Sequence, residues 1–311
     1  MEWLLLALLL LLLQASQQEL STVKQLGLDA TPAPQQELST VMELELDMAP
    51  TAFDDQYQGC SKLMEEEVAE LNRAELSSDR QYAEAWALAA EEWRSRRGRV
   101  PAALVPEQAL ALLAYTQQGA LHRRFNAAVR QGGRSRGHYL RSFPFKALHF
   151  LLSRALAALG AAQPPRCRRV YRGVRGVRFR ARPGSAVRFG HFASASTSNG
   201  SAAAFGRDSF FCLRTCYGVA VRDFSFYPEE DEVLIPPFES FEVLSVSQAG
   251  GTALIELRSR GGHSNYNCEF VKEKRCQSHP CPFSSGRSIR GAPPHLWVLL
   301  AAAALAPPGG H

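Results

Sequence analysis

Three kinds of motif are missing from this sequence of 311 residues, and each absence narrows its function. There is no Cys-x-x-Cys pair and no pair of histidines at metal-ligand spacing, so we expect no metal site. No Gly-x-Gly-x-x-Gly opens a helix after a strand, so a Rossmann-type dinucleotide site is not supported. The net charge of +5 is mild, and we expect no nucleic acid partner.

Apolar runs long enough to span a bilayer are also lacking. Leu4–Leu13 is almost entirely leucine but too short for a membrane helix, and small and polar residues follow it at 14–16. Residues 1–16 are therefore predicted to be a secretory signal peptide. Glu2 departs from the usual pattern, because a positive charge is expected there.

A second short apolar run, Leu296–Ala306, lies near the C-terminus. Small residues at 284–286 and a polar spacer at 287–295 precede it, which is the order typical of a GPI-attachment signal. We therefore expect residues 286–311 to be a propeptide and the mature chain to be anchored at the extracellular face of the plasma membrane. Secretion, or an uncleaved tail, is the competing interpretation.

The cysteines become interpretable once export is expected. Outside the cell disulfides are the default, so a zinc site is the weaker alternative. The sequence has seven cysteines, and because this number is odd, at least one thiol is free or pairs between chains. They are Cys60, Cys167, Cys212, Cys216, Cys268, Cys276 and Cys281.

The order of sequence patterns predicts the fold class. Residues 17–49, in which Gln17–Val23 recurs as Gln35–Val41, are expected to be a poorly ordered leader before a folded domain at 50–282. Up to about Gly160 the apolar residues recur at helical spacing, and from Cys167 onward short strands are expected. This order predicts an α+β fold, with a helical N-terminal half packed on a β-rich C-terminal half. The expected strands are 170–171, 209–213, 217–221, 233–235, 241–246 and 252–257.

An acidic run stands directly before an apolar stretch at 224–237. Residues two apart on a strand point to the same face, so Glu230 and Glu232 are predicted to project side by side, with Asp231 opposite. The competing interpretation is a solvated acidic turn before an edge strand.

Two other stretches of the β-rich half carry residues suited to ligand binding. Val170–Val174 places Arg172 on a strand, followed by a glycine that would allow close approach of a ligand. Phe189–Ser196 places Ser194 and Ser196 at alternate positions after an aromatic residue. Taken alone, the arginine could equally belong to a solvated strand face, and the serines to an edge strand.

Together, these three stretches resemble the R-S-E signature of arginine-specific mono-ADP-ribosyltransferases. More closely, the chain resembles the vertebrate GPI-anchored ecto-ADP-ribosyltransferases, with the three motifs in the family's order. The resemblance covers roughly residues 50–282, nearly all of the mature chain. Further matching segments are Phe53–Tyr57, Leu113–Thr116, Phe125-Asn126 and Tyr266–Glu269.

The resemblance implies a role for each residue of the signature. Arg172 would pair with the pyrophosphate of NAD, which a planar guanidinium can bind through two hydrogen bonds. Ser194, with Ser196 as the alternate serine, would position the catalytic Glu232. That carboxylate would stabilise the positive charge that develops when nicotinamide leaves the ribose. Glu230 would hold the acceptor guanidinium and take a proton from it.

The resemblance also implies contacts with NAD for Tyr115, Ser225 and His191. The position of His191 is often glutamine in relatives, so the histidine is a departure from the family pattern. The sequon Asn199–Ser201 follows the serine motif closely, so a glycan there must point away from the cleft. The family pattern further pairs Cys60 with Cys268. Cys167 and Cys216 flank the strands expected to carry the active site and are expected to form a second pair, which leaves Cys212, Cys276 and Cys281 unassigned.

We therefore expect an enzyme that transfers ADP-ribose from NAD to arginine side chains of extracellular or membrane proteins and releases nicotinamide. NAD is its co-substrate, no metal is expected, and a GPI lipid is the expected link to the membrane. One alternative has the same site with water as acceptor, which makes it an NAD glycohydrolase. The other is a surface interaction module without catalysis.

Overall fold

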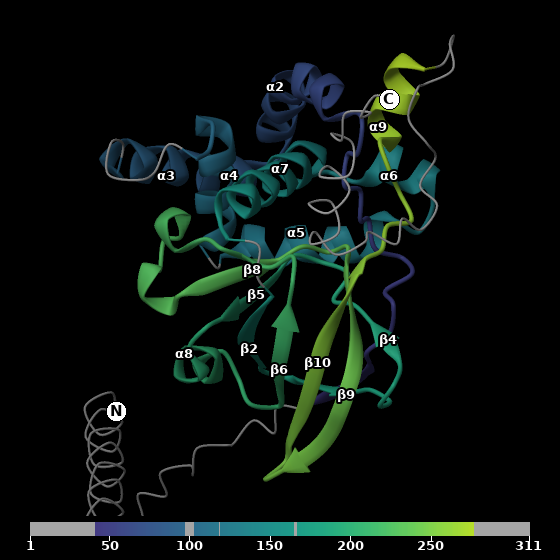
Figure 1. Cartoon of the computed structure of the whole chain (residues 1–311). Coiled ribbons are helices and arrows are strands. Elements are labelled where there is room, and N and C mark those ends of the chain that lie inside the picture. The colour runs from purple at the N-terminus through teal and green to yellow at the C-terminus, as the bar shows by residue number, and fades with distance from the viewer. Residues whose placement is uncertain (1–40, 97–102, 118, 165–166, 277–311) are drawn as a thin grey trace, which may run out of the picture. The chain divides into compact units, whose positions relative to one another are not determined.

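The computed structural model describes residues 41–96, 103–117, 119–164 and 167–276 (Figure 1). After one short strand at 42–45, the helices come first along the chain and form one part of the structure, and the strands that follow form a sheet beside them (Figure 1). This order confirms the predicted α+β fold with a helical N-terminal half and a β-rich C-terminal half.

The helical half contains α2 (Ser61–Ser78), α3 (Arg80–Arg96), α4 (Pro106–Thr116), α5 (Ala120–Gly132), α6 (Arg136–Ser142) and α7 (Lys146–Ala162). The strands are β1 (Met42–Glu45), β2 (Arg168–Val174), β3 (Val177–Arg180), β4 (Ala186–Val187), β5 (Ala193–Ser196), β6 (Ser209–Thr215), β7 (Val219–Ala220), β8 (Glu232–Ile235), β9 (Glu239–Ala249) and β10 (Thr252–Gly262). Two short helices, α8 (Asn199–Ala204) and α9 (Glu269–Arg275), and two 3₁₀ turns, η1 (Arg222–Phe224) and η2 (Pro228–Glu230), complete the described elements.

Helix α7 forms the centre of the helical half and is buried along most of its length. Its first backbone N–H groups have no partner within the helix, and they donate hydrogen bonds to the buried carboxylate of Glu75 in α2. The distances from the Glu75 oxygen to the nitrogens of Lys146 and Ala147 are 2.6 and 3.2 Å. Burial raises the pKa of Glu75 to about 7, although these hydrogen bonds act to lower it.

The main sheet has the strand order β4-β9-β10-β6-β2-β5-β8-β7. Strands β2, β5 and β8 are neighbours in it, the pairs β2–β5 and β5–β8 are antiparallel, and the short β7 pairs with the outer side of β8. In this register Ser196 lies opposite both Tyr171 and Glu232, and Ser194 lies opposite Leu234. The sheet therefore places the three signature stretches side by side, and β8 is not the edge strand that the competing interpretation assumed.

The folded part of the chain begins earlier than predicted. Residues 17–49 were expected to be a leader, but Met42–Glu45 form β1, which pairs in parallel with β3. All four residues of β1 are exposed, so hydrogen bonding to β3 rather than burial holds the strand. Residues 42–48 alternate apolar and acidic side chains, which is the pattern of a strand, so the sequence did carry a signal for β1.

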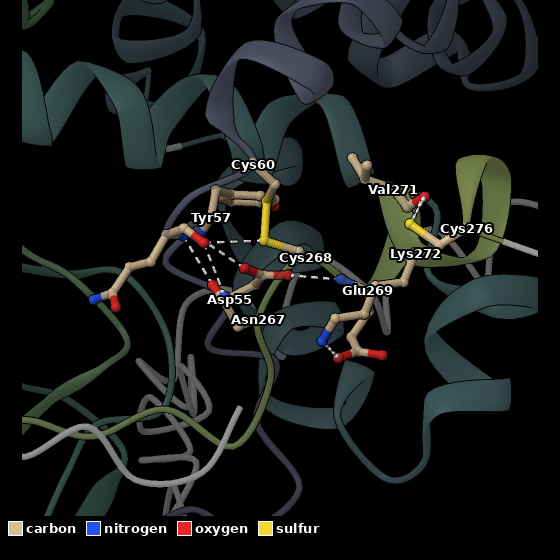
Figure 2. Close-up of a disulfide and its surroundings, with 10 residues drawn as sticks. Asp55, Tyr57, Cys60, Asn267, Cys268, Glu269, Val271, Lys272 and Cys276 are labelled. Carbon is tan, nitrogen blue, oxygen red and sulfur yellow. Dashed lines mark hydrogen bonds and ion pairs between the residues drawn. A yellow bond between two sulfur atoms is a disulfide. The ribbon is translucent and has the colours of Figure 1, made fainter. Parts of the chain in front are cut away.

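Two disulfides confirm both cysteine pairs predicted from the sequence. Cys60 at the start of α2 is bonded to Cys268 at the start of α9, and Cys167 is bonded to Cys216. Around the first bridge, Asp55 accepts hydrogen bonds from the backbone nitrogens of Tyr57 and Glu269 (Figure 2). This bridge joins chain segments separated by 208 residues.

A buried ion pair reinforces the same junction. The guanidinium of Arg188 lies 2.5 Å from the carboxylate of Asp54, and both side chains are fully buried. The carboxylate oxygens of Asp54 also accept hydrogen bonds from the backbone nitrogens of Asn265 and Tyr266. Because both charges are buried, removing either partner would leave the other charge uncompensated.

Cys212 is the free cysteine among the described residues, and Cys276 takes part in a further disulfide. Cys281, the signal peptide at 1–16 and the GPI propeptide at 286–311 lie outside the described residues. Within the described ranges, no group of histidine, cysteine and acidic side chains could hold a metal ion. In the same ranges, no single helix is long and apolar enough to cross a membrane. The bent pair α6 and α7, taken together, has the length and the apolar composition of a membrane span.

Candidate active site

A cleft of about 560 Å³ opens where β2, β5 and the start of β8 meet α5 and α8. Arg172, Ser194, Glu232 and Glu230 all line it, so the structure brings the four predicted catalytic positions together. The complete lining is His122, Arg123, Tyr171, Arg172, Gly173, Val174, Arg175, Ser194, Ala195, Ser196, Ala202, Phe205, Glu230 and Glu232. The signature stretches all lie in the β half, but α5 of the helical half supplies one wall of the cleft.

Glu232 is the most deeply placed acid of the cleft, with 5% of its surface exposed. Burial raises the pKa of its carboxyl to about 7, and the nearby charge of Glu230 acts in the same direction. Hydrogen bonds from Ser194 and Ser225 and the charge of Arg172 act against this rise. The Ser225 hydroxyl lies 3.3 Å from the carboxylate. Glu232 is thus a desolvated carboxyl held by two serines.

Arg172 lies on β2 and points its guanidinium at the next strand. Its Nη1 donates a 2.5 Å hydrogen bond to the backbone oxygen of Ser194. The guanidinium carbon also lies 5.7 Å from the centre of the Phe189 ring. Burial lowers the pKa of Arg172 to about 10, so the group stays charged at neutral pH. A guanidinium has five N–H groups, so it can bind an anion in the cleft while keeping its contact with β5.

The predicted strand geometry of the two glutamates is wrong. The strand begins at Glu232, whereas Glu230 ends the 3₁₀ turn η2 and Asp231 has left-handed backbone angles, φ 48° and ψ 48°. Pro228 suits the first position of such a turn, and aspartate tolerates the left-handed region better than most residues. The turn still directs both Glu230 and Glu232 into the cleft.

Ser196 fixes this acidic turn rather than the carboxylate of Glu232. Its hydroxyl donates a 2.6 Å hydrogen bond to the backbone oxygen of Glu230 and accepts one of 2.9 Å from the backbone nitrogen of Ser198. Ser194, two residues earlier on the same strand, is the serine whose hydroxyl hydrogen-bonds Glu232. The two serines therefore hold the two glutamates separately.

The three further predicted NAD contacts lie behind the cleft and are not part of its lining. Tyr115 of α4 is 1% exposed and donates a 2.7 Å hydrogen bond to the backbone oxygen of Phe192. His191 is buried against Arg130 and the backbone oxygen of Phe189. Burial lowers the pKa of His191 well below its usual range, so the ring is neutral.

Ser225 follows η1 and is fully buried. It reaches the site only through its hydrogen bond to Glu232. Tyr115, His191 and Ser225 thus support the residues that face the cleft, and their direct contact with NAD stays a prediction.

Gly173 has a different role from the one expected. A Cβ at this position would lie 2.2 Å from the backbone oxygen of Ala202 and 2.4 Å from that of Gly206. Gly173 is therefore required by the close approach of the backbone of α8 and of the residues that follow it, whether or not a ligand also lies close. This contact sets α8 against β2, where it forms a wall of the cleft.

Sequence reasoning missed several cleft residues, among them His122, Arg123 and Phe205. His122 and Arg123 lie on α5, three and two residues before the matching Phe125-Asn126 segment, which was the available signal. Tyr171 was noted only as a strand residue next to Arg172. Nothing in the helical pattern of α5 shows which of its residues faces the sheet.

The fold and the site together define an ADP-ribosyltransferase that uses NAD. The sheet places an arginine, a serine and a glutamate on three adjacent strands around one cleft, and the cleft volume falls in the range of small-molecule sites. Its charged guanidinium suits a pyrophosphate, and its buried carboxylate suits a developing cation. The residues present therefore fit NAD as the bound co-substrate.

Comparison with known families agrees and is more specific. The family model of NAD:arginine ADP-ribosyltransferases matches residues 46–265, and the chain belongs to this family. It is 54% identical over 257 residues to the erythroblast NAD(P)(+)–arginine ADP-ribosyltransferase of Gallus gallus, covering 81% of this chain and 85% of that protein. It is 47% identical to the GPI-linked NAD(P)(+)–arginine ADP-ribosyltransferase 1 of Homo sapiens, covering 80% and 81%.

Among solved structures, the chain is similar to the eukaryotic mono-ADP-ribosyltransferase ART2.2. The crystal structure of that protein aligns with a TM-score of 0.63 and 37% identity, covering 72% of this chain and 98% of the other. A variant of ART2.2 has also been solved in complex with NAD.

Proposed function

We propose that this protein transfers ADP-ribose from NAD to the guanidinium of arginine in proteins, with Glu232 as the residue that makes the step possible. The observation that carries the proposal is the position of Glu232. It is a nearly fully buried carboxylate, flanked by two serine hydroxyls, in a cleft whose other side carries Arg172.

The chemistry follows from where charge develops. The bond between C1 of the ribose and the nicotinamide nitrogen breaks, and its electron pair leaves with the nicotinamide. Positive charge then builds at C1, and Glu232 stabilises it from a fixed position that needs no solvent reorganisation. Arg172 holds the pyrophosphate, so the ribose cannot turn away from the carboxylate.

Glu230 provides the acceptor side of the reaction. The half-buried carboxylate of Glu230 lines the same cleft as Glu232, and Ser196 fixes the turn that carries it. It holds the incoming guanidinium, which is positively charged, and accepts the proton that leaves when the new bond from C1 to the guanidinium nitrogen forms. The two glutamates thus serve the two halves of one displacement.

The test measures two products of the purified protein at once. We expect it to form ADP-ribosylated agmatine, a small arginine analogue, from NAD, with equal release of nicotinamide. Free ADP-ribose should be the minor product while agmatine is saturating. If free ADP-ribose instead accounts for all nicotinamide released at every agmatine concentration, the protein is an NAD glycohydrolase. Absence of any nicotinamide release would favour the interaction module.

The site of action follows from the ends of the chain. We propose that residues 1–16 are removed on export, that residue 284, 285 or 286 receives a GPI lipid, and that the enzyme acts on arginines of extracellular or membrane proteins. The GPI-linked names of several relatives support this placement. The mature catalytic domain then runs to about residue 282, as the sequence predicts.

A further inference from the structure

His122 is a cleft residue with a defined orientation and no assigned role. It lies in the first turn of α5, is half-buried, and lines the cleft next to Arg172. Its Nε2 lies 3.1 Å from the hydroxyl of Tyr115, and the two rings are perpendicular with their centres 4.7 Å apart. The buried phenol therefore fixes one nitrogen of this imidazole.

The hydrogen bonds of Tyr115 determine which nitrogen of His122 carries the proton. A phenol has one hydrogen, and the backbone oxygen of Phe192, 2.7 Å away, can only accept it. The Tyr115 oxygen must therefore accept its other hydrogen bonds. Asn126 donates one through Nδ2 at 3.0 Å, and His122 must donate another through Nε2. A neutral His122 is then protonated at Nε2 and has an unprotonated Nδ1.

The surroundings keep this ring neutral. Burial lowers the pKa of His122 to about 4, and the positive charges of Arg172, Arg123 and Arg130 act in the same direction. Among the described residues, no protein group donates a hydrogen bond to Nδ1 of His122. The cleft wall therefore presents a neutral acceptor amid guanidinium groups that all act as donors.

We propose that His122 determines how NAD is bound, by accepting a hydrogen bond at Nδ1 from a ribose hydroxyl of the dinucleotide. This inference rests on the proposed function, since it takes NAD as the ligand of the cleft. Ribose hydroxyls are favoured because Arg172, beside His122, is the pyrophosphate ligand, and both riboses are attached directly to the pyrophosphate. A phosphate oxygen is excluded, because it would face the lone pair of Nδ1.

Two substitutions separate this role from simple support of Tyr115. In His122→Asn the amide oxygen stands near the place of Nδ1, so the acceptor is kept and the contact with Tyr115 is lost. In His122→Gln the amide nitrogen stands near the place of Nε2, so the contact with Tyr115 is kept and the acceptor is lost. The proposal therefore predicts that Gln impairs NAD binding and that Asn impairs stability.

The first readout is the Kd of NADH, measured by fluorescence titration. NADH carries the same riboses but no cationic leaving group, so it reports binding without reaction. His122→Gln should weaken binding about tenfold and His122→Asn by no more than about threefold, as expected for loss of one hydrogen bond. Normal binding by His122→Gln together with weak binding by His122→Asn would overturn the proposal and leave His122 as a support for Tyr115 alone.

The second readout identifies the donor with NAD analogues that each lack one ribose hydroxyl. For the wild type, one analogue should raise the KM about tenfold, measured by nicotinamide release, and the same analogue should have no further effect in His122→Gln. Equal losses in both proteins would contradict the proposal. Because both readouts are independent of the acceptor, a failure to modify arginine would reject the proposed function and leave this test interpretable.

Discussion

At the scale of single residues, the two cleft glutamates should divide the reaction between them. Replacing Glu232 with Gln keeps its shape but removes the charge that stabilises the cation, so transfer and NAD hydrolysis should both fall about 100- to 1000-fold. Glu230→Gln should abolish transfer to agmatine while hydrolysis largely persists, because only the group that binds the acceptor guanidinium changes. The measurement is both rates for both variants.

The control for this pair is Glu229→Gln. Glu229 is the preceding residue of the same turn, but it is exposed and does not line the cleft. Its substitution should change neither rate more than about twofold, as is usual for an exposed side chain. Should Glu230→Gln remove hydrolysis as completely as Glu232→Gln, the proposed division of roles is incorrect.

The same Glu232 should lower the stability of the fold at neutral and basic pH. Its pKa is about 7 in the folded protein and about 4.5 when exposed, so between these values the folded state binds more protons than the unfolded state. Stability contributed by protonated Glu232 is therefore complete below pH 4.5 and is lost as the pH rises through 7. At pH 8, Glu232→Gln should be more stable than the wild type by about 3 kcal/mol.

Thermal unfolding at two pH values tests this prediction. For a domain of this size the gain corresponds to about 6–12 °C in Tm at pH 8, and it should shrink to about a quarter of that near pH 5. A gain that is equal at both pH values would show that the charge of Glu232 is not its cause. The active-site carboxylate would then carry no measurable cost to folding.

At the scale of elements, the close approach of β2 to α8 depends on Gly173. Gly173→Ala would place a methyl group 2.2 Å from a backbone oxygen, so α8 must move, and overpacking of this kind costs about 1–3 kcal/mol. Since Ala202 and Phe205 of this segment line the cleft, the KM for NAD should rise as well. Denaturant unfolding and initial rates of nicotinamide release measure the two effects.

Gly200→Ala is the matched control, because it lies in α8 itself. A Cβ there would meet its nearest neighbour, the hydroxyl oxygen of Ser198, at an ordinary 3.7 Å. The substitution also preserves the Asn-x-Ser sequon, so glycosylation is unchanged. It should leave the KM unaffected and stabilise the helix slightly. Equal behaviour of the two variants would show that the contact at Gly173 does not hold α8 in place.

At the scale of the whole molecule, the predicted signal peptide and GPI-attachment signal imply that a lipid attaches the mature protein to the membrane. Phosphatidylinositol-specific phospholipase C should release transferase activity from intact cells that express the full sequence. A variant that ends before Leu296 lacks the apolar tail, so its activity should appear in the medium without treatment. Activity that stays on cells after an effective treatment would mean that the tail is retained or that attachment is indirect.

Much of the fold and of the site was predictable from sequence because its signals are local. Apolar spacing identified α2, α3, α4 and α7, and β-branched and aromatic runs identified β2, β6, β8, β9 and β10. The order of helices before strands gave the α+β class. The signature motifs identified Arg172, Ser194, Glu230 and Glu232 as cleft residues, since each motif spans only a few neighbouring positions. The family pattern supplied the Cys60–Cys268 disulfide, and the positions of Cys167 and Cys216 on either side of the signature strands supplied the second.

What only the tertiary structure decided depends on contacts between distant segments. The period of two along a strand assigned Glu230 and Glu232 to one face, but a 3₁₀ turn and a left-handed Asp231 intervene, and both still reach the cleft by a different path. Tyr115 donates to the backbone oxygen of Phe192, which directly precedes β5 and lies 77 residues further along the chain, and that contact places it behind the cleft wall. His122 faces the cleft because α5 borders the same cleft as β2 and β5, and no local pattern encodes that arrangement.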